Sequence, residues 1–311
     1  MSWKDLLDHR LLFVTGKGGT GKTSLAAAIG LRCAAEGRRT VVVEIENHAP
    51  TLPSVLGVRS SYQPQFAAPN LAVCNLTWDH ALEDWLALNL PIERLRHLVQ
   101  SNRIVQTFLV ATPGAQETVI LSKIVALLES WDTVVVDLPA SGHALSLLRV
   151  PAITIRMVRS GPIRTRALAI LGRLRSSDVA TLLVSMPEET IVTETLETAE
   201  RFRREVPEIA IGAVVLNRSS LPSFTDSECL LLDRLSSRTN LRAEDQELLL
   251  AGRWEHSLEQ ATREALERLQ PIGAPIHDFP RLGALGGFAG GPERVIQQMA
   301  AAIARKSLGM P

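Results

Sequence analysis

The chain has 311 residues, of which 46% are hydrophobic, enough for the core of one α/β domain or of two smaller domains. Its 33 basic and 33 acidic residues cancel, so the overall charge gives no reason to expect a nucleic acid or an anionic membrane as a partner. The three cysteines form no C-x-x-C pair, which argues against a zinc site built from neighbouring residues and indicates a reducing compartment.

The first ten residues (MSWKDLLDHR) are polar and lead directly into a predicted strand, unlike a secretory signal. No uncharged apolar run further along approaches the roughly 18 residues of a membrane-spanning helix. We therefore expect a cytoplasmic protein.

Short apolar runs rich in β-branched residues alternate with helical patterns along the rest of the chain. All but the last of these runs are almost wholly apolar, which is typical of strands buried on both faces of a parallel sheet. The alternation predicts an α/β fold in which helices cover both faces of a doubly wound, mostly parallel sheet. The predicted strands are 11–15, 40–45, 133–138, 179–185, 209–217 and 274–279.

Two helical stretches interrupt this alternation. Residues 78–110 are predicted to form two amphipathic helices, the second starting at Pro91, and residues 224–270 form a long helical region. A Gly-rich loop after the last strand leads to a closing helix that starts at Pro292. We predict a single domain over residues 1–311, with 78–110 as a small helical insertion that either packs as plain core or forms an apolar cap.

The segment from Gly16 to Thr23 matches the phosphate-binding pattern G-x-x-x-x-G-K-[ST]. It follows a predicted buried strand and opens a predicted helix, which is the context that this motif requires. Its glycines let backbone amides turn toward phosphates, Lys22 would neutralise the β and γ phosphates, and the Thr23 hydroxyl would bind Mg²⁺. The predicted ATP-binding residues here are Gly16, Gly18, Gly19, Thr20, Gly21, Lys22, Thr23 and Ser24.

A second acid that organises Mg²⁺ is expected at the end of a neighbouring buried strand. Asp137 follows four strand residues in WDTVVVDLPASGH and meets this expectation. Because Asp is also a common helix N-cap, Asp137 could organise the metal, cap the next helix, or do both.

The eight residues from Gly16 to Thr23 (GKGGTGKT) resemble the deviant Walker A motif of the MinD/ParA/nitrogenase iron protein class. Within this class, residues 137–143 (DLPASGH) resemble the second switch of the ArsA and tail-anchored-protein-targeting ATPases, and residues 161–194 resemble their compact bacterial members. The resemblance implies a fold of the P-loop NTPase type and an ATPase that uses ATP and Mg²⁺. Arsenite binding in the pump relies on a thiol cluster, whereas the three cysteines here are far apart in the sequence.

Further elements extend this resemblance from residue 11 to about residue 300. TPGAQE (112–117) is similar to the P-G-x-x-E element of these ATPases, and VVLNR (214–218) is similar to the segment that holds their adenine-contacting Asn. The resemblance therefore implies that Asn217 contacts adenine. FPRLG (279–283) falls where the family has a proline-bearing loop beside the base, which adds Pro280 and Arg281 as candidates.

Lys17 is one lysine more than a phosphate-binding loop needs. In the deviant Walker A class the extra lysine reaches across a two-fold dimer to the nucleotide of the facing subunit. The resemblance thus implies that Lys17 is catalytic together with Lys22, and that the chain forms a homodimer or a heterodimer with a related ATPase.

The first switch departs from the family pattern. Where the targeting ATPases carry an Asp that positions the attacking water, this chain reads VEIENHAPTLPSVLG. Glu46 is the nearest carboxylate beyond the strand and is the predicted catalytic residue, and Glu44 should face the same way. Counted back from Gly57, Asn47 takes the position instead; an Asn could orient water but not accept its proton, so hydrolysis would be slow or absent.

The predicted function is a Mg²⁺-dependent ATPase that couples hydrolysis to dimer switching and to a protein client or partner. One alternative is a weakly hydrolysing scaffold subunit of a heterodimer, and another is a ParA-like positioning ATPase bound to DNA. The second alternative rests on an arginine strip over residues 149–175, which either pairs with the glutamates of 188–208 or docks nucleic acid or anionic lipid. The strip consists of Arg149, Arg156, Arg159, Arg164, Arg166, Arg173 and Arg175.

Overall fold

The computed structural model describes residues 2–45, 50–89, 114–236, 238, 241–282 and 291–308. The strands are β1 (Leu11–Gly16), β2 (Thr40–Ile45), β3 (Gln65–Ala68), β4 (Leu71–Leu76), β5 (Thr133–Asp137), β6 (Val179–Ser185), β7 (Ala210–Ser219) and β8 (Ile276–Pro280). The helices within the described residues are α1 (Trp3–Leu7), α2 (Lys22–Ala35), α3 (Thr51–Val55), α4 (Trp78–Asn89), α7 (Ala115–Leu127), α8 (Ser141–Met157), α9 (Pro162–Leu174), α10 (Glu189–Glu205), α11 (Asp226–Ser236), α12 (Ala243–Leu269) and α13 (Pro292–Ser307).

The strands form one sheet in the order β3-β4-β2-β5-β1-β6-β7-β8. All neighbouring pairs are parallel except β3 and β4, which pair antiparallel at one edge. β1 lies near the centre, between β5 and β6, so the loop that follows it is flanked by the ends of two other strands. This arrangement confirms the predicted α/β fold with a mostly parallel sheet.

Helices cover both faces of the sheet, and the alternation of side chains along β1 shows why its first four residues, Leu11 to Val14, are all apolar. Leu11 and Phe13 point into a core formed with α7, α8, α10 and α12. Leu12 and Val14 point into the opposite core, which is formed with α1, α2 and α13. A strand buried on both faces has no polar side, which is why its sequence reads as a continuous apolar run.

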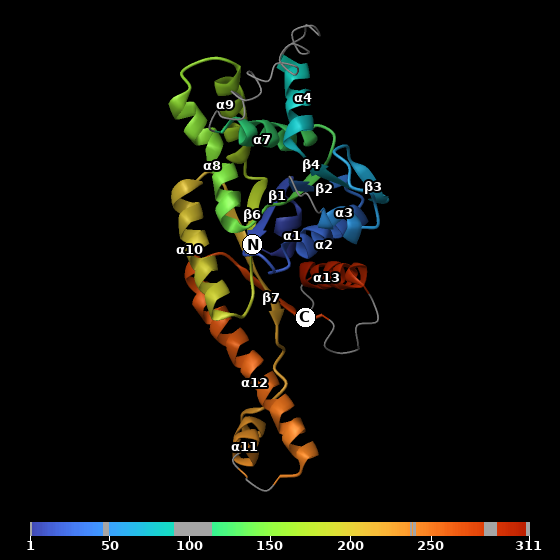
Figure 1. Cartoon of the computed structure of the whole chain (residues 1–311), viewed down its shortest axis with the longest axis vertical. Helices are drawn as coiled ribbons and strands as arrows, with labels where there is room; N and C mark the ends of the chain where they lie inside the picture. Colours follow the sequence, from blue (N-terminus) through green and yellow to red (C-terminus); the bar gives the residue numbers. More distant parts are fainter. Residues whose placement is uncertain are drawn as a thin grey trace.

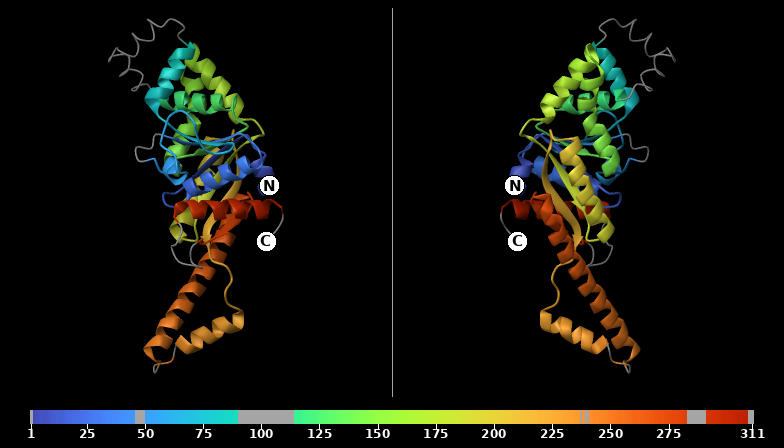
Figure 2. Two further views of the ribbon diagram at one scale, coloured as in Figure 1. Left: turned by 90° about the vertical axis from the view of Figure 1, so that its right-hand side faces the viewer. Right: turned by 90° about the vertical axis from the view of Figure 1, so that its left-hand side faces the viewer.

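The molecule is elongated, with the sheet in its middle (Figure 1). Helices α4, α7, α8 and α9 gather at one end, while α11 and the first half of α12 extend from the other end as a separate helical hairpin (Figures 1 and 2). No helix among the described residues is long and apolar enough to cross a membrane.

Three features differ from the sequence-based expectations or extend them. The hairpin of β3 and β4 was not predicted, because its strands are short and follow a stretch rich in Ser, Gln and Pro. The helical region 224–270 is two helices, α11 and α12. The first helix of the 78–110 insertion is confirmed as α4, and the second, with Pro91, lies outside the described residues.

Candidate phosphate-binding site

The turn between β1 and α2 can be formed only with glycine at its two ends. Gly16 has φ +154°, and a Cβ there would overlap the carbonyl oxygen of Val184 on β6. Gly21 precedes the first residue of α2 with φ +94°, and a Cβ there would overlap the side chain of Asn217. Gly19 also has positive φ. The loop therefore curls tightly over the N-terminus of α2, where backbone N–H groups and the helix dipole favour an anion.

Lys22, the first residue of α2, lies inside this loop. Its Nζ donates to the carbonyl of Lys17 at 3.0 Å, and the Thr20 hydroxyl donates to the same carbonyl at 2.9 Å. Burial lowers the pKa of Lys22, and the nearby carboxylate of Asp137 partly opposes this shift. An ammonium whose charge is poorly solvated gains from an anion placed against it.

Thr23 and Asp137 meet beside Lys22. The Thr23 hydroxyl donates to Oδ2 of Asp137 at 2.6 Å. Burial raises the pKa of Asp137 to about 6; the Thr23 hydrogen bond and Lys22 oppose this shift, and Glu44 adds to it. The other oxygen, Oδ1, is buried without a hydrogen-bond partner among the described residues. A hydroxyl next to a carboxylate with an open oxygen fits Mg²⁺, which takes a few protein oxygens and keeps other positions for phosphates and water.

The second reading of Asp137, as a helix cap, does not hold. The N-cap of α8 is Ala140, and it makes no side-chain cap hydrogen bond. Asp137 is instead the last residue of β5, in register with Val14 of β1 and Glu44 of β2.

Glu44 is a buried acid in the strand next to Asp137. Its carboxylate accepts from the backbone N–H of Thr51 at 3.2 Å and of Leu52 at 3.4 Å, at the start of α3. It thereby ties the end of β2 to the helix that follows the first switch. The two candidates for the water-positioning residue, Glu46 and Asn47, lie outside the described residues, so the choice between them stays a prediction.

Asn217 lies against the phosphate loop. Its Nδ2 donates to the carbonyl of Thr20 at 2.8 Å, and its Oδ1 accepts from the backbone N–H of Arg218. Pro280 and Arg281 lie at the end of the adjacent strand β8, where the Arg281 N–H donates to the Ser219 carbonyl. The structure thus brings the three predicted adenine-side residues together, and it adds a role for Asn217 as a clamp on the loop.

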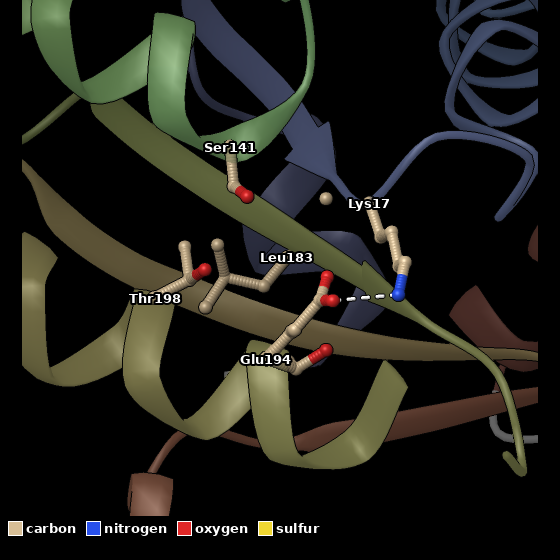
Figure 3. A pocket seen from close by; sticks show the side chains of 7 residues that line it. Lys17, Ser141, Leu183, Glu194 and Thr198 are labelled. Carbon is tan, nitrogen blue, oxygen red and sulfur yellow. Dashed lines mark hydrogen bonds and ion pairs between the residues drawn. The ribbon is translucent and has the colours of Figure 1, made fainter. Parts of the chain in front are cut away.

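Lys17, at the mouth of the loop, pairs with a residue that no motif had indicated. Its Nζ lies 2.6 Å from Oε1 of Glu194 on α10, and both side chains are partly exposed. Figure 3 shows the two side chains pointing toward each other beside a small hollow that Ser141 also lines. Ser141 belongs to the second-switch segment, so Lys17, at the mouth of the loop, lies close to that switch.

The arginine strip is largely engaged within its own chain. Arg149 and Arg175 pair with Glu205 and Glu208, as the first reading of the strip expected. Arg173 pairs with Asp178. Arg164 donates to backbone carbonyls of α8 and the residue after it, and Arg166 donates to the Ser122 hydroxyl at 3.2 Å. These contacts favour a structural role for most of the strip.

The three cysteines lie in three different places. Cys33 and Cys74 are buried in the cores on opposite faces of the sheet, and burial raises the pKa of both thiols to about 12. Cys229 lies on α11, with its Sγ 3.3 Å from Nδ1 of His256. The first two are small core residues, whereas Cys229 contacts a histidine.

Comparison with known proteins identifies relatives of this chain. The family model of the anion-transporting ATPases (ArsA_ATPase) matches residues 9–171, which include the whole phosphate loop and the second switch. ATPase BagA of Mycobacterium tuberculosis is 27% identical over 305 residues, covering 87% of this chain and 87% of that protein. An uncharacterized protein of Streptomyces coelicolor is 33% identical over 220 residues, covering 68% of this chain and 53% of its own length. The arsenical pump-driving ATPase of Acidiphilium multivorum is 25% identical over 221 residues, 64% of this chain but only 37% of that protein.

Proposed function

This chain belongs to the ArsA family of ATPases and is an ATP hydrolase, and we propose that it works as two facing subunits that assemble on ATP and separate after hydrolysis. The observation that carries the proposal is the pair of lysines on one loop. Lys22 already occupies the loop interior, whereas Lys17 points away from it toward α10. A second cation at the mouth is best placed for phosphates presented by another subunit.

Within each subunit, the residues of the site have separate tasks. The loop amides and the N-terminus of α2 bind the phosphates, and Lys22 neutralises their charge from inside the loop. Thr23 and Asp137 would hold Mg²⁺, which would neutralise phosphate charge there. Asn217 keeps the loop closed through the Thr20 carbonyl. Glu46 is the proposed base for the attacking water.

Hydrolysis would be coupled to the far end of the molecule through α8. This helix starts four residues after Asp137 and packs on α7 and α9, and α7 packs on α4. Helices α4, α7 and α9 line a cavity of about 290 Å³ whose walls include Trp85, Val119 and Lys123. We place the client or partner at this end, because a movement of the second switch reaches it through one continuous helix. Hydrogen exchange that differs at α4 and α7 between ATP and ADP would support this placement, and identical exchange would contradict it.

Replacing Lys17 by Ala tests the dimer mechanism. The variant should bind ATP within a few-fold of the wild type, because Lys22 and the loop amides remain. It should remain monomeric with a non-hydrolysable ATP analogue in sedimentation, and its turnover should fall by about 10²- to 10³-fold, as when one donor to transition-state charge is removed. Lys4→Ala, at an exposed position on α1, is the control and should change neither quantity. A Lys17→Ala protein that is monomeric and fully active would refute the mechanism.

A further inference from the structure

The ion pair between Lys17 and Glu194 joins the phosphate loop to α10 within one chain. The turn of α10 that carries Glu194 is attached to the sheet by its neighbour in the sequence. The next residue, Thr195, is buried; its hydroxyl donates to the carbonyl of Ile191 at 2.7 Å and lies 3.0 Å from Oγ of Ser185, whose hydroxyl can donate to it. These contacts fix the turn of α10 that carries Glu194 against the end of β6, within reach of the Lys17 side chain.

The hollow beside the two residues is too small for a ligand. It is lined by Gly16, Lys17, Ser141, Leu183, Glu194, Thr195 and Thr198 and has no room for a water molecule (Figure 3). The contact therefore does not mark a second binding site. It is a direct charge pair that occupies the Lys17 ammonium in the absence of a partner subunit.

We infer that Glu194 is a positioning residue that holds Lys17 in its own subunit until a second copy of the chain binds. The inference rests on the proposed function, in which Lys17 acts on the nucleotide of the facing subunit. The Lys17 ammonium has three N–H donors but occupies one place, so in this mechanism it leaves its position 2.6 Å from Glu194 to reach phosphates held in the other subunit. Each dimer therefore forms at the cost of two such pairs.

Lys17 also connects its ion pair with Glu194 to the nucleotide-binding loop. The backbone carbonyl of Lys17 accepts from Lys22 Nζ and from the Thr20 hydroxyl, so the loop interior and the Lys17 side chain share one peptide unit. Phosphate in the loop competes with that carbonyl for Lys22. Nucleotide binding would therefore remove the hydrogen bond from Lys22 to the Lys17 backbone, while the ion pair with Glu194 still holds the Lys17 side chain.

The strength of the contact follows from its exposure. The side chains of Lys17 and Glu194 are 37% and 42% exposed, so water screens their attraction. Ion pairs of this kind change an equilibrium constant by about 1.5- to 5-fold. Because two pairs are released in one dimer, the factors multiply to about 2- to 25-fold in the dimer dissociation constant. An ion pair of this strength weakens dimer formation without preventing it.

Glu194→Gln in the full chain tests the inference, since it removes the charge and keeps the size of the side chain. With Mg²⁺ and a non-hydrolysable ATP analogue, its dimer dissociation constant in sedimentation should be about 2- to 25-fold lower than that of the wild type. The difference should shrink toward zero at about 1 M salt, where screening removes exposed ion pairs. Glu200→Gln, an equal charge change at an exposed position of the same helix, should show no difference, and Glu194→Asp should lie between Glu194→Gln and the wild type.

A second readout does not depend on dimers. Without nucleotide, reductive methylation of Lys17, followed by mass spectrometry, should be faster in Glu194→Gln than in the wild type. Unchanged or weaker dimerisation of Glu194→Gln, in a protein whose wild type dimerises on ATP, overturns the inference and leaves the proposed function standing. A wild type that stays monomeric with ATP at every concentration overturns the proposed function itself, and the inference with it.

Discussion

The interior and the mouth of the phosphate loop each hold one lysine in very different surroundings. Inside, Lys22, Thr23 and Asp137 are packed together, and burial shifts the pKa of both charged groups toward their neutral forms. At the mouth, Lys17 and Glu194 form one partly exposed ion pair. Burying the charges of Lys22 and Asp137 in the interior costs free energy, which a bound ligand of opposite charge can offset. At the mouth, Lys17 and Glu194 already neutralise each other.

This difference separates binding from switching. A site whose charges are unfavourable without ligand gains most when phosphate and Mg²⁺ arrive, which suits tight nucleotide binding. The ion pair of Lys17 and Glu194 is weak, so it can be exchanged for a contact of similar strength with another subunit, which suits reversible assembly of subunits. Changes to the interior should therefore have large effects on nucleotide binding, and changes at the mouth should act on assembly.

Lys22→Ala should have the largest effect on binding. Truncating one partner of a partly buried charge pair costs several kcal/mol, so the ATP dissociation constant should rise on the order of 10³-fold. The stability of the nucleotide-free protein should not fall, because burial already disfavours the Lys22 charge. Calorimetric titration with ATP and thermal unfolding check the two parts. Retained ATP affinity would contradict the assignment of the loop interior.

Asp137→Asn should lower turnover and yet stabilise the nucleotide-free protein. The folded-state pKa of Asp137, about 6, is above the unfolded value of 3.8, so the folded state binds the proton more tightly and stability is lost as pH rises between these values. Above pH 6 the penalty is constant at about 3 kcal/mol. Asn avoids it at every pH and can still accept the Thr23 hydrogen bond.

Urea unfolding of both proteins at pH 5 and pH 7 measures this penalty. The gain in the free energy of unfolding that Asp137→Asn gives over the wild type should be about 1 kcal/mol larger at pH 7 than at pH 5. Asp132→Asn, an exposed acid just before β5, is the control for a general charge effect. An advantage that does not change with pH would show that Asp137 is not the titrating group.

Asn217→Ala should have the smallest of these effects. It removes one hydrogen bond to the Thr20 carbonyl, worth about 0.5–1.5 kcal/mol, so the KM for ATP should rise by about 2- to 12-fold. Gly21 leaves the loop free to relax into the space that the side chain vacates. An Asn217→Ala protein with unchanged KM for ATP but altered preference for GTP would assign the residue to base reading alone.

Much of the fold was predictable because burial on both faces leaves a clear pattern. β1, β2, β5 and β6 consist mostly of apolar residues, and the glycines of the loop match a spaced motif. The β3–β4 hairpin was missed because β3 has only four residues and follows a stretch rich in Ser, Gln and Pro, and because β4 leads almost directly into α4. Short strands at a sheet edge depend on their partner more than on their own residues.

The site was predictable where a motif fixes the spacing and unpredictable where contacts come from distant segments. Lys22, Thr23 and Asp137 meet as expected. Glu194 lies 177 residues from Lys17, and nothing in the sequence around it distinguishes it from the other glutamates of α10. The clamp formed by Asn217 was missed for a related reason, since the sequence places it at a strand end but not against Thr20.

Mixing two inactive variants tests the shared site most directly. Lys17→Ala keeps Lys22 and Lys22→Ala keeps Lys17, so a mixed dimer contains one site with both cations, contributed by different chains. Random pairing at equal amounts makes up to about one quarter of the wild-type number of complete sites. We predict that the mixture regains ATP turnover toward that level at protein concentrations where the wild type is dimeric. A mixture no more active than either variant alone under those conditions would contradict the action of Lys17 on the facing subunit.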